Sequence, residues 1–139
     1  HDITKEESDE NQLKLCKKRG IILDSLVLSM PQLIHAITAS EIAREEFDAS
    51  EEICRAILYH TTGSGDMSTF DKCLWLADLI EPGRCFPGVD EIRKEAEVNL
   101  NNACLMGIER TLSYLSEGEK KVHPAMLDAR HEMERILKR

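Results

Sequence analysis

Five side chains of types that commonly bind transition metals are spread along the first 78 residues of the sequence: His1, Asp2, His35, His60 and Asp78. Neutral imidazole nitrogens and carboxylate oxygens suit iron, manganese, zinc or magnesium in a hydrolytic centre. Adjacent residues on a helix point about 100° apart, so a helical His1-Asp2 pair could serve two metals, or its carboxylate could bridge both. Two metals about 3.5–4 Å apart can clamp a phosphoryl oxygen. The set predicts a two-metal centre.

Each of these residues also has a purely structural interpretation. His35 lies among apolar residues and could be a hydrogen-bonded core histidine, and His60 at a helix end could interact with the helix dipole. Asp78 lies in the apolar stretch Leu-Ala-Asp-Leu-Ile, where an unpaired buried carboxylate is costly. A salt bridge with Arg84 would satisfy it as well as a metal would. Taken together, the spaced ligands favour the metal centre.

A second group of residues could bind phosphate. Thr61, Thr62 and Gly63 directly follow His60, and hydroxyls with backbone N–H groups in a glycine-containing loop are natural phosphate donors. The same three residues would also serve as a helix C-cap and turn.

Two cations could neutralise phosphate charge. Lys5 follows Asp2 by three residues and would share its face on a continued helix, although it could equally be a solvated lysine. Arg84 follows the rigid Glu81-Pro82-Gly83 loop, and its planar fork matches phosphate oxygens. An ion pair of Arg84 with Glu81 or with Asp78 is the alternative, and both roles can coexist.

One further carboxylate could orient the site. Asp71 precedes Asp78 by seven residues, close to two helical turns, so the two share a helix face. Asp71 could therefore orient a metal-bound histidine or Lys72. Its structural alternative is a carboxylate in the first turn of a helix, where the dipole favours it.

Composition predicts a single all-helical domain. The chain has 139 residues, 42% hydrophobic and only 4% aromatic, which is enough for a core built from Leu, Ile, Val, Ala and Met. Its content of Glu, Lys, Leu and Ala favours an all-α bundle. The net charge of −8 argues against a nucleic-acid duplex as partner but permits a small polyphosphate.

The cysteines and the hydropathy pattern indicate in which cellular compartment the protein is expected. Five cysteines without a CxxC pair indicate neither a zinc knuckle nor a disulfide framework, so we expect reduced thiols in a cytoplasmic protein. No apolar run reaches the roughly 20 residues that span a membrane, and no signal peptide is evident.

Capping residues and apolar spacing outline the helices. We expect helices over about 11–19 and 32–47, with Leu33, Ile34, Ile37, Ile42 and Phe47 as apolar positions of the second. Further helices should begin at an N-cap Ser50 and at a Ser68–Asp71 capping box. Asp90 should cap one long helix through Leu112, and Pro124 should open the closing helix. The segment 21–30 is ambiguous.

The order of these motifs resembles the HD superfamily of metal-dependent phosphohydrolases. That superfamily carries the pattern H…HD…H…H…D, and HDITK matches its HD-x-x-K form. The stretch AILYHTTGSGDMSTFDKCLWLADLIEPGRCFPGVDEIRKEA and the later HPAMLDAR are similar to the YqeK-type branch, the symmetrical bis(5'-nucleosyl)-tetraphosphatases. The resemblance covers nearly the whole chain and implies an HD-type helical bundle over residues 1–139.

The resemblance also implies a ligand set, an activity and residue roles. It implies two metal ions, iron first, with manganese, zinc or magnesium as alternatives, and symmetric hydrolysis of diadenosine tetraphosphate to two ADP by a metal-bound hydroxide. The implied catalytic residues are Asp2, Lys5 and Arg84, the substrate is bound by Lys5, Thr61, Thr62, Gly63 and Arg84, and Asp71 supports the ligands. The metal ligands would be His1, Asp2, His35, His60 and Asp78.

One element of the superfamily pattern has no counterpart in the sequence. The first His of that pattern precedes the HD pair, so we expect an upstream helix carrying it to be missing before His1. His123 and His131 do not replace it convincingly.

Two other functions, and the formation of a homodimer, are also compatible with the sequence. The chain could be an HD-type hydrolase of another nucleotide, or a non-catalytic nucleotide-binding module with a degenerate metal site. The long amphipathic helices also leave room for a homodimer.

Overall fold

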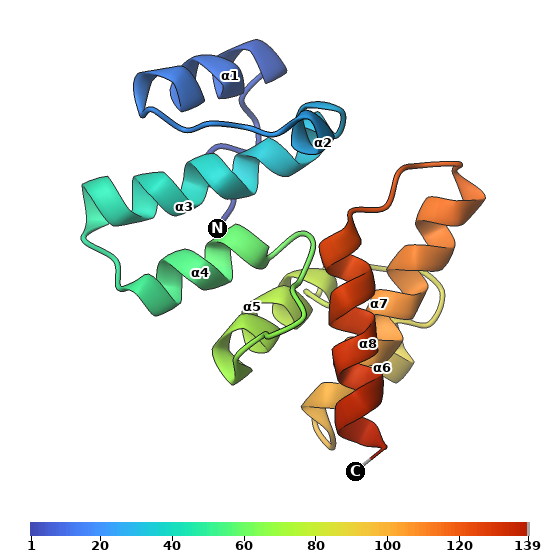
Figure 1. Ribbon diagram of the computed structural model, residues 1–139. Helices are drawn as coiled ribbons and strands as arrows, with labels where there is room; N and C mark the ends of the chain where they lie inside the picture. Colours follow the sequence, from blue (N-terminus) through green and yellow to red (C-terminus); the bar gives the residue numbers. More distant parts are fainter. Residues whose placement is uncertain (139) are drawn as a thin grey trace. The chain divides into compact units, whose positions relative to one another are not determined.

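The computed structural model describes residues 1–138, and every regular element in that range is a helix (Figure 1). This confirms the predicted all-α class. None of the described helices is long and apolar enough to cross a membrane. The elements are α1 (Asp9–Lys18), α2 (Ser25–Leu28), the 3-10 helix η1 (Pro31–Leu33), α3 (Ile34–Phe47), α4 (Glu51–Tyr59), α5 (Thr69–Leu79), α6 (Val89–Ala96), α7 (Leu100–Glu117) and α8 (Pro124–Leu137).

The chain forms two compact units, His1–Thr61 and the part from Thr62 onward, and each is described by itself. The expectation of one HD domain over residues 1–139 stays a prediction.

Helix α3 is the centre of the first unit and contacts both α1 and α4 (Figure 1). Small side chains make this close packing possible, since Ala36, Ala39 and Ala43 are all buried on α3. The hydroxyl of Ser40 donates to the carbonyl of Cys54 on α4 at 2.7 Å. The two helices run antiparallel, because only a short loop joins them.

The segment before α1 folds as turns, which corrects the expectation that the His1-Asp2 pair lies on a helix. Its backbone bonds join residues three apart, from the N–H of Lys5 to Asp2 and from that of Glu7 to Thr4, both at 3.0 Å. Ser8 has extended dihedrals and caps α1 through its side chain, so the helix begins only at Asp9.

A buried polar network ties this turn to the helices behind it. The hydroxyl of Thr4 lies 2.8 Å from that of Thr38 and donates to the carbonyl of His35 at 3.1 Å. Thr38 also donates to the side-chain oxygen of Gln12 on α1 at 2.7 Å. Buried polar groups need such partners, so the network fixes the turn relative to α3.

Three helix starts confirm the capping predictions. The Ser50 hydroxyl accepts from the N–H of Ile53 at the start of α4. Ser68 and Asp71 form a reciprocal capping box at α5, with bonds of 3.1 Å and 2.8 Å. Pro124 occupies the first turn of α8, and the side chain of His123 caps that helix.

The long helix expected after residue 90 is two helices, α6 and α7. The break falls at residues 97–99, and Asn99 caps α7 by accepting from the N–H of Asn102. Asp90 does not cap α6, since Gly88 with a φ of +92° holds that position. Asp90 instead pairs with Arg93 at 2.8 Å. Apolar residues keep a helical spacing on both sides of residues 97–99, so the side-chain pattern alone did not reveal the turn between the two helices.

Phe47 corrects the apolar face expected for the second helix, because it is 65% exposed. It lies in the last turn of α3, beside a hollow of about 220 Å³ that it lines together with Ala43 and Ile53.

Helix α7 is the spine of the second unit and contacts α5, α6 and α8. Its core contains the residues Met67, Trp75, Leu76, Ile92, Ala103, Cys104, Ile108, Met126, Ala129 and Met133. All five cysteines of the chain are free, and burial raises the pKa of the Cys104 thiol to about 12.

Gly107 allows α5 to approach α7 closely. A β-carbon built at this position would lie 2.6 Å from Cδ2 of Leu79 and 3.0 Å from Cζ3 of Trp75. The lack of a side chain at this position is therefore what lets the two helices pack together.

We expect Gly107→Ala to destabilise the protein by about 1–2 kcal/mol. Alanine gains up to about 1 kcal/mol of helix propensity over glycine, but overpacking costs about 1–3 kcal/mol, and the 2.6 Å approach to Leu79 favours the upper part of that range. Urea unfolding followed by circular dichroism measures the difference. Gly118→Ala is the control, because the nearest atoms there belong to the flexible Lys120 side chain. A Gly107→Ala protein as stable as the parent would contradict this packing argument.

Candidate metal and phosphate site

Two histidines at the ends of neighbouring helices direct the same ring nitrogen towards one point. His35 lies in the first turn of α3, and His60 follows the last residue of α4. Their Nε2 atoms are 3.1 Å apart. The side chain of His60 is only 1% exposed and that of His35 12%, so both rings are largely shielded from water.

The other ring nitrogen fixes the tautomer of each histidine. Nδ1 of His35 lies 2.7 Å from the carbonyl oxygen of Gln32, and Nδ1 of His60 lies 2.6 Å from that of Ile57. A carbonyl oxygen only accepts, so each Nδ1 carries the hydrogen. In the neutral rings both Nε2 atoms therefore present lone pairs, and a histidine oriented in this way is prepared to bind a metal.

The carboxylate of Asp2 faces the same point with one oxygen. Oδ1 lies 3.4 Å from Nε2 of His35 and 3.3 Å from Nε2 of His60. It is buried, and no hydrogen bond reaches it from any residue in the described part of the chain. Its other oxygen, Oδ2, lies 3.0 Å from Nζ of Lys5 and 3.4 Å from Nε2 of His1.

The charge state of Asp2 follows from its neighbours. Burial acts to raise the pKa of this carboxyl, but the hydrogen bond and charge of Lys5 lower it, as would a proton on His60 or His35. The pKa therefore lies below its ordinary value, and Asp2 is an anion at neutral pH.

The donor set fits a metal ion. Three lone-pair atoms form a triangle with edges of 3.1, 3.3 and 3.4 Å. Ligand atoms bonded to one zinc-sized ion at about 2.1 Å and at tetrahedral angles would lie about 3.4 Å apart. The lone pairs of these three atoms repel one another. A proton on one Nε2 would reduce this repulsion by donating to one of the other two atoms, but the remaining atom would still receive no hydrogen.

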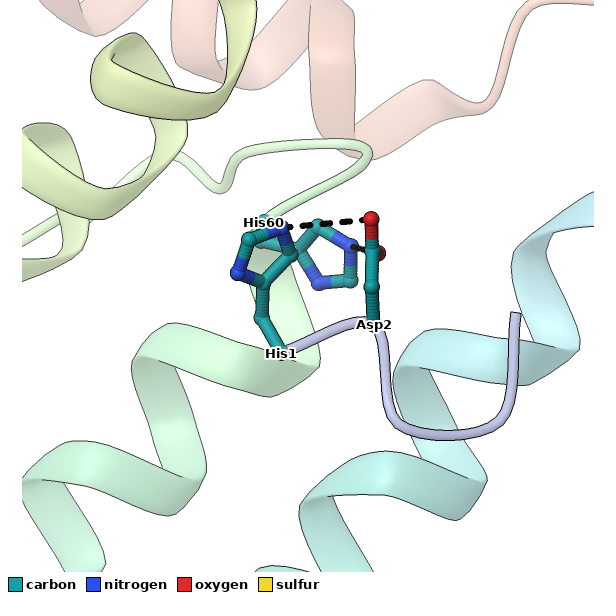
Figure 2. A group of neighbouring side chains, drawn as sticks. All are labelled: His1, Asp2 and His60. Carbon is teal, nitrogen blue, oxygen red and sulfur yellow. Dashed lines mark ion pairs between the residues drawn. The ribbon is translucent and has the colours of Figure 1, made fainter. Parts of the chain in front are cut away.

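His1 adds a further nitrogen next to this triangle. Its ring stacks edge-on against that of His60, with centroids 4.7 Å apart. The ligand atoms of His1, Asp2 and His60 all lie within 4.8 Å of one another (Figure 2). Figure 2 shows both rings beside the carboxylate of Asp2, which is joined to each by an ion pair. The two Asp2 oxygens thus face different imidazoles.

The structure brings together four of the five predicted ligands in the first unit. The fifth, Asp78, belongs to the second unit, on α5, where its Oδ1 lies 3.6 Å from Nη2 of Arg84. Asp71 on the same helix is buried, and its Oδ2 serves the capping box. The ligand role of Asp78 and the orienting role of Asp71 stay predictions.

The division between the units falls inside the predicted phosphate loop. Thr61 is the last residue of the first unit, and Thr62 and Gly63 begin the second. The Thr62 hydroxyl is mostly buried and donates to the carbonyl of Gly63 at 2.9 Å. Gly63 has a φ of +67°, the left-handed conformation that favours glycine in such a turn.

Sequence reasoning missed Arg93, which holds the loop that carries Arg84. From α6 its guanidinium donates to three backbone carbonyls, those of Ile80, Glu81 and Arg84, at 2.8–2.9 Å. The spacing Asp90-x-x-Arg93 could have indicated a fixed arginine, because residues three apart on a helix are neighbours. Arg84 itself lies 3.6 Å from a Glu81 oxygen, so both predicted ion pairs are present.

Comparison with known proteins places these features in a family. No protein-family model matches the sequence. The symmetrical bis(5'-nucleosyl)-tetraphosphatase of Halalkalibacterium halodurans is 32% identical over 120 residues, and that of Bacillus subtilis is 43% identical over 95. These alignments cover 86% and 68% of this chain but 64% and 51% of the relatives. The chain thus spans about half to two thirds of their length.

A solved structure decides the assignment. A crystal structure from Clostridium acetobutylicum, described as a predicted HD superfamily hydrolase involved in NAD metabolism, is 32% identical with a TM-score of 0.91. The match covers all of this chain and 73% of the other. The chain belongs to the HD superfamily of hydrolases. The HD-type fold and the resemblance to the symmetrical tetraphosphatase branch are thereby confirmed.

We expect Arg93→Met to loosen the loop of residues 81–84 by removing three hydrogen bonds. The loss should cost about 1–3 kcal/mol, because a charged donor to three carbonyls is replaced by water or by nothing. Hydrogen exchange of the Arg84 amide, which donates to the carbonyl of Glu81, should accelerate about tenfold or more.

Arg135→Met is the matched control for this substitution. Arg135 lies on α8 and bonds only the side chain of Glu132 among the contacts described, so its loss should change stability by less than about 0.5 kcal/mol. Equal exchange rates in the two variants would contradict the role assigned to Arg93.

Proposed function

We propose that this chain carries the catalytic unit of a metal-dependent hydrolase that cleaves diadenosine tetraphosphate symmetrically into two ADP. The observation that carries the proposal is the convergence of His35 Nε2, His60 Nε2 and Asp2 Oδ1 on one point. The substrate is taken from the two relatives, both named symmetrical bis(5'-nucleosyl)-tetraphosphatase.

The proposed ligands are the nitrogen and oxygen donors His1, Asp2, His35, His60 and Asp78, and they would hold two metal ions. Iron is the first candidate, with manganese, zinc and magnesium as alternatives, because an N/O donor set accepts all four. When bound, such ions lower the pKa of water and neutralise charge on phosphoryl oxygens.

The chain's own cations would act on the polyphosphate. Lys5 lies 3.0 Å from Asp2 and so would face a phosphoryl group bound next to that carboxylate. The guanidinium of Arg84 offers a planar fork for a phosphate, held in place by its loop. The Thr61, Thr62 and Gly63 turn would contribute hydroxyl and backbone donors. Water then attacks one of the two central phosphorus atoms, and the bond to the central bridging oxygen breaks to release ADP on both sides.

We expect the metal-reconstituted protein to convert diadenosine tetraphosphate into ADP alone. Anion-exchange chromatography of the products measures the outcome, with diadenosine triphosphate and nucleoside monophosphates as comparison substrates. His35→Ala should lower kcat/KM by about 100-fold or more, since it removes a ligand of the centre. His131→Ala, an exposed histidine of α8, is the control. Mixed ATP and AMP would contradict symmetric cleavage, and faster turnover of monophosphates would favour the other nucleotide alternative.

We also expect metal to stabilise the protein through the histidine cluster, whether or not the substrate is correct. A ligand at 100 times its Kd adds about 2.7 kcal/mol to the free energy of unfolding. Urea unfolding with and without Mn²⁺ or Fe²⁺ should show this gain in the parent and in His131→Ala, and should lose most of it in His35→Ala. An equal gain in His35→Ala would show that the metal binds elsewhere.

A further inference from the structure

A cavity of about 310 Å³ in the second unit lies next to Arg84. Its lining is Leu79, Arg84, Phe86, Arg110, Thr111 and Tyr114, contributed by α5, by the loop after it and by α7. The volume is near the lower end for small-molecule pockets, which is roughly 300–1,000 Å³. It suits one compact ligand or one end of a longer one.

The lining combines two kinds of chemistry. Phe86 and Tyr114 are two of the few aromatic residues in a chain that is only 4% aromatic, and Leu79 adds an apolar wall. Arg84 and Arg110 supply two guanidinium groups in a chain of net charge −8. A flat aromatic base attached to phosphate matches this combination, because bases stack on aromatic rings and arginines bind phosphate in planar pairs.

The polar groups of the cavity retain hydrogen-bonding capacity. The ion pairs of Arg84 with Asp78 and with Glu81 are both 3.6 Å long, and that of Arg110 with Glu117 is 3.8 Å long, which is beyond hydrogen-bond distance. Their N–H groups can therefore turn to an anion. The Thr111 hydroxyl donates to the carbonyl of Gly107 at 2.9 Å, so its oxygen can still accept from a ribose or a base.

Tyr114 is held in place although it is 54% exposed. The ammonium of Lys120 lies 4.5 Å from its ring centroid and 3.0 Å from its hydroxyl oxygen. A ring fixed in this way loses less conformational entropy when a base stacks on it. Lys120 also adds a positive charge beside Tyr114.

We propose that this cavity binds one nucleoside of the nucleotide substrate, with Tyr114 and Phe86 contacting the base and Arg110 the phosphate nearest to it. The proposal rests on the proposed function for the nucleotide class, and Arg84 links the two, since it lines the cavity and pairs with Asp78. The apolar hollow beside Phe47 in the first unit has no arginine or lysine in its lining and lacks this match.

Binding of ADP to the full chain tests the proposal without any catalytic step. NMR titration of the ¹⁵N-labelled protein with ADP should shift the amide signals of Thr111 and Tyr114, and pyrophosphate, which lacks a base, should shift them less. Tyr114→Ala and Arg110→Ala should each raise the Kd for ADP roughly tenfold, the scale of one lost stacking or charged contact. Tyr114→Phe, which keeps the ring, should stay within about threefold of the parent.

The controls separate this proposal from folding effects and from the proposed function. Arg135→Ala, an arginine on α8 outside the cavity, should leave the Kd for ADP unchanged, and circular dichroism should show all variants folded. No shift with millimolar ADP, equal Kd values for Tyr114→Ala and the parent, or identical shifts with pyrophosphate would overturn the proposal.

Two mixed results distinguish the cavity from the activity. If ADP shifts these signals but diadenosine tetraphosphate is not hydrolysed, the cavity stands and the proposed activity fails. If diadenosine tetraphosphate is hydrolysed and Tyr114→Ala has the KM of the parent, the activity stands and the cavity proposal fails.

Discussion

Three electron-pair donors held within 3.4 Å of one another are the constraint around which the first unit is arranged. Asp2, His35 and His60 would repel each other if nothing positive lay between them. Each neutral histidine donates its single ring N–H to the backbone carbonyl of the residue three positions earlier, so neither ring can turn away without losing that hydrogen bond. The protein therefore maintains an arrangement whose natural complement is a cation.

The surrounding architecture explains how that arrangement is maintained. His35 lies in the first turn of α3 and His60 follows α4, so the antiparallel pairing of these helices brings the two rings together. The small residues between the helices set their distance. Asp2 comes from a turn, and the turn is fixed by the hydroxyls of Thr4 and Thr38, both buried. A polar network inside the unit thus decides where the carboxylate lies.

The second unit also holds a candidate functional side chain, Arg84, in a defined position, but through the hydrogen bonds of one arginine. Arg84 lies on an exposed loop that has no core of its own, yet Arg93 holds three of the carbonyls around it. Gly107 lets α5 approach α7, and Leu79 and Arg84 then line one cavity together with residues of α7. Fixing a loop by the hydrogen bonds of one arginine rather than by apolar packing leaves its other side chains open to a polar ligand.

Residue type and spacing by themselves determined the helical class and the caps at Ser50, Ser68 and Pro124, and they singled out the candidate ligands that meet in the first unit. These features are local, because a cap or a helical period depends on residues within about four positions. Only the tertiary structure decided that the His1-Asp2 pair lies on a turn, that α6 and α7 are separate, and that Arg93 fixes the loop. The turn and the loop depend on partners distant in the chain, such as Thr38 for the turn, and no local pattern states which distant group will satisfy a buried hydroxyl or carbonyl. The break between α6 and α7 depends on the local cap of Asn99, which the continuous apolar spacing did not reveal.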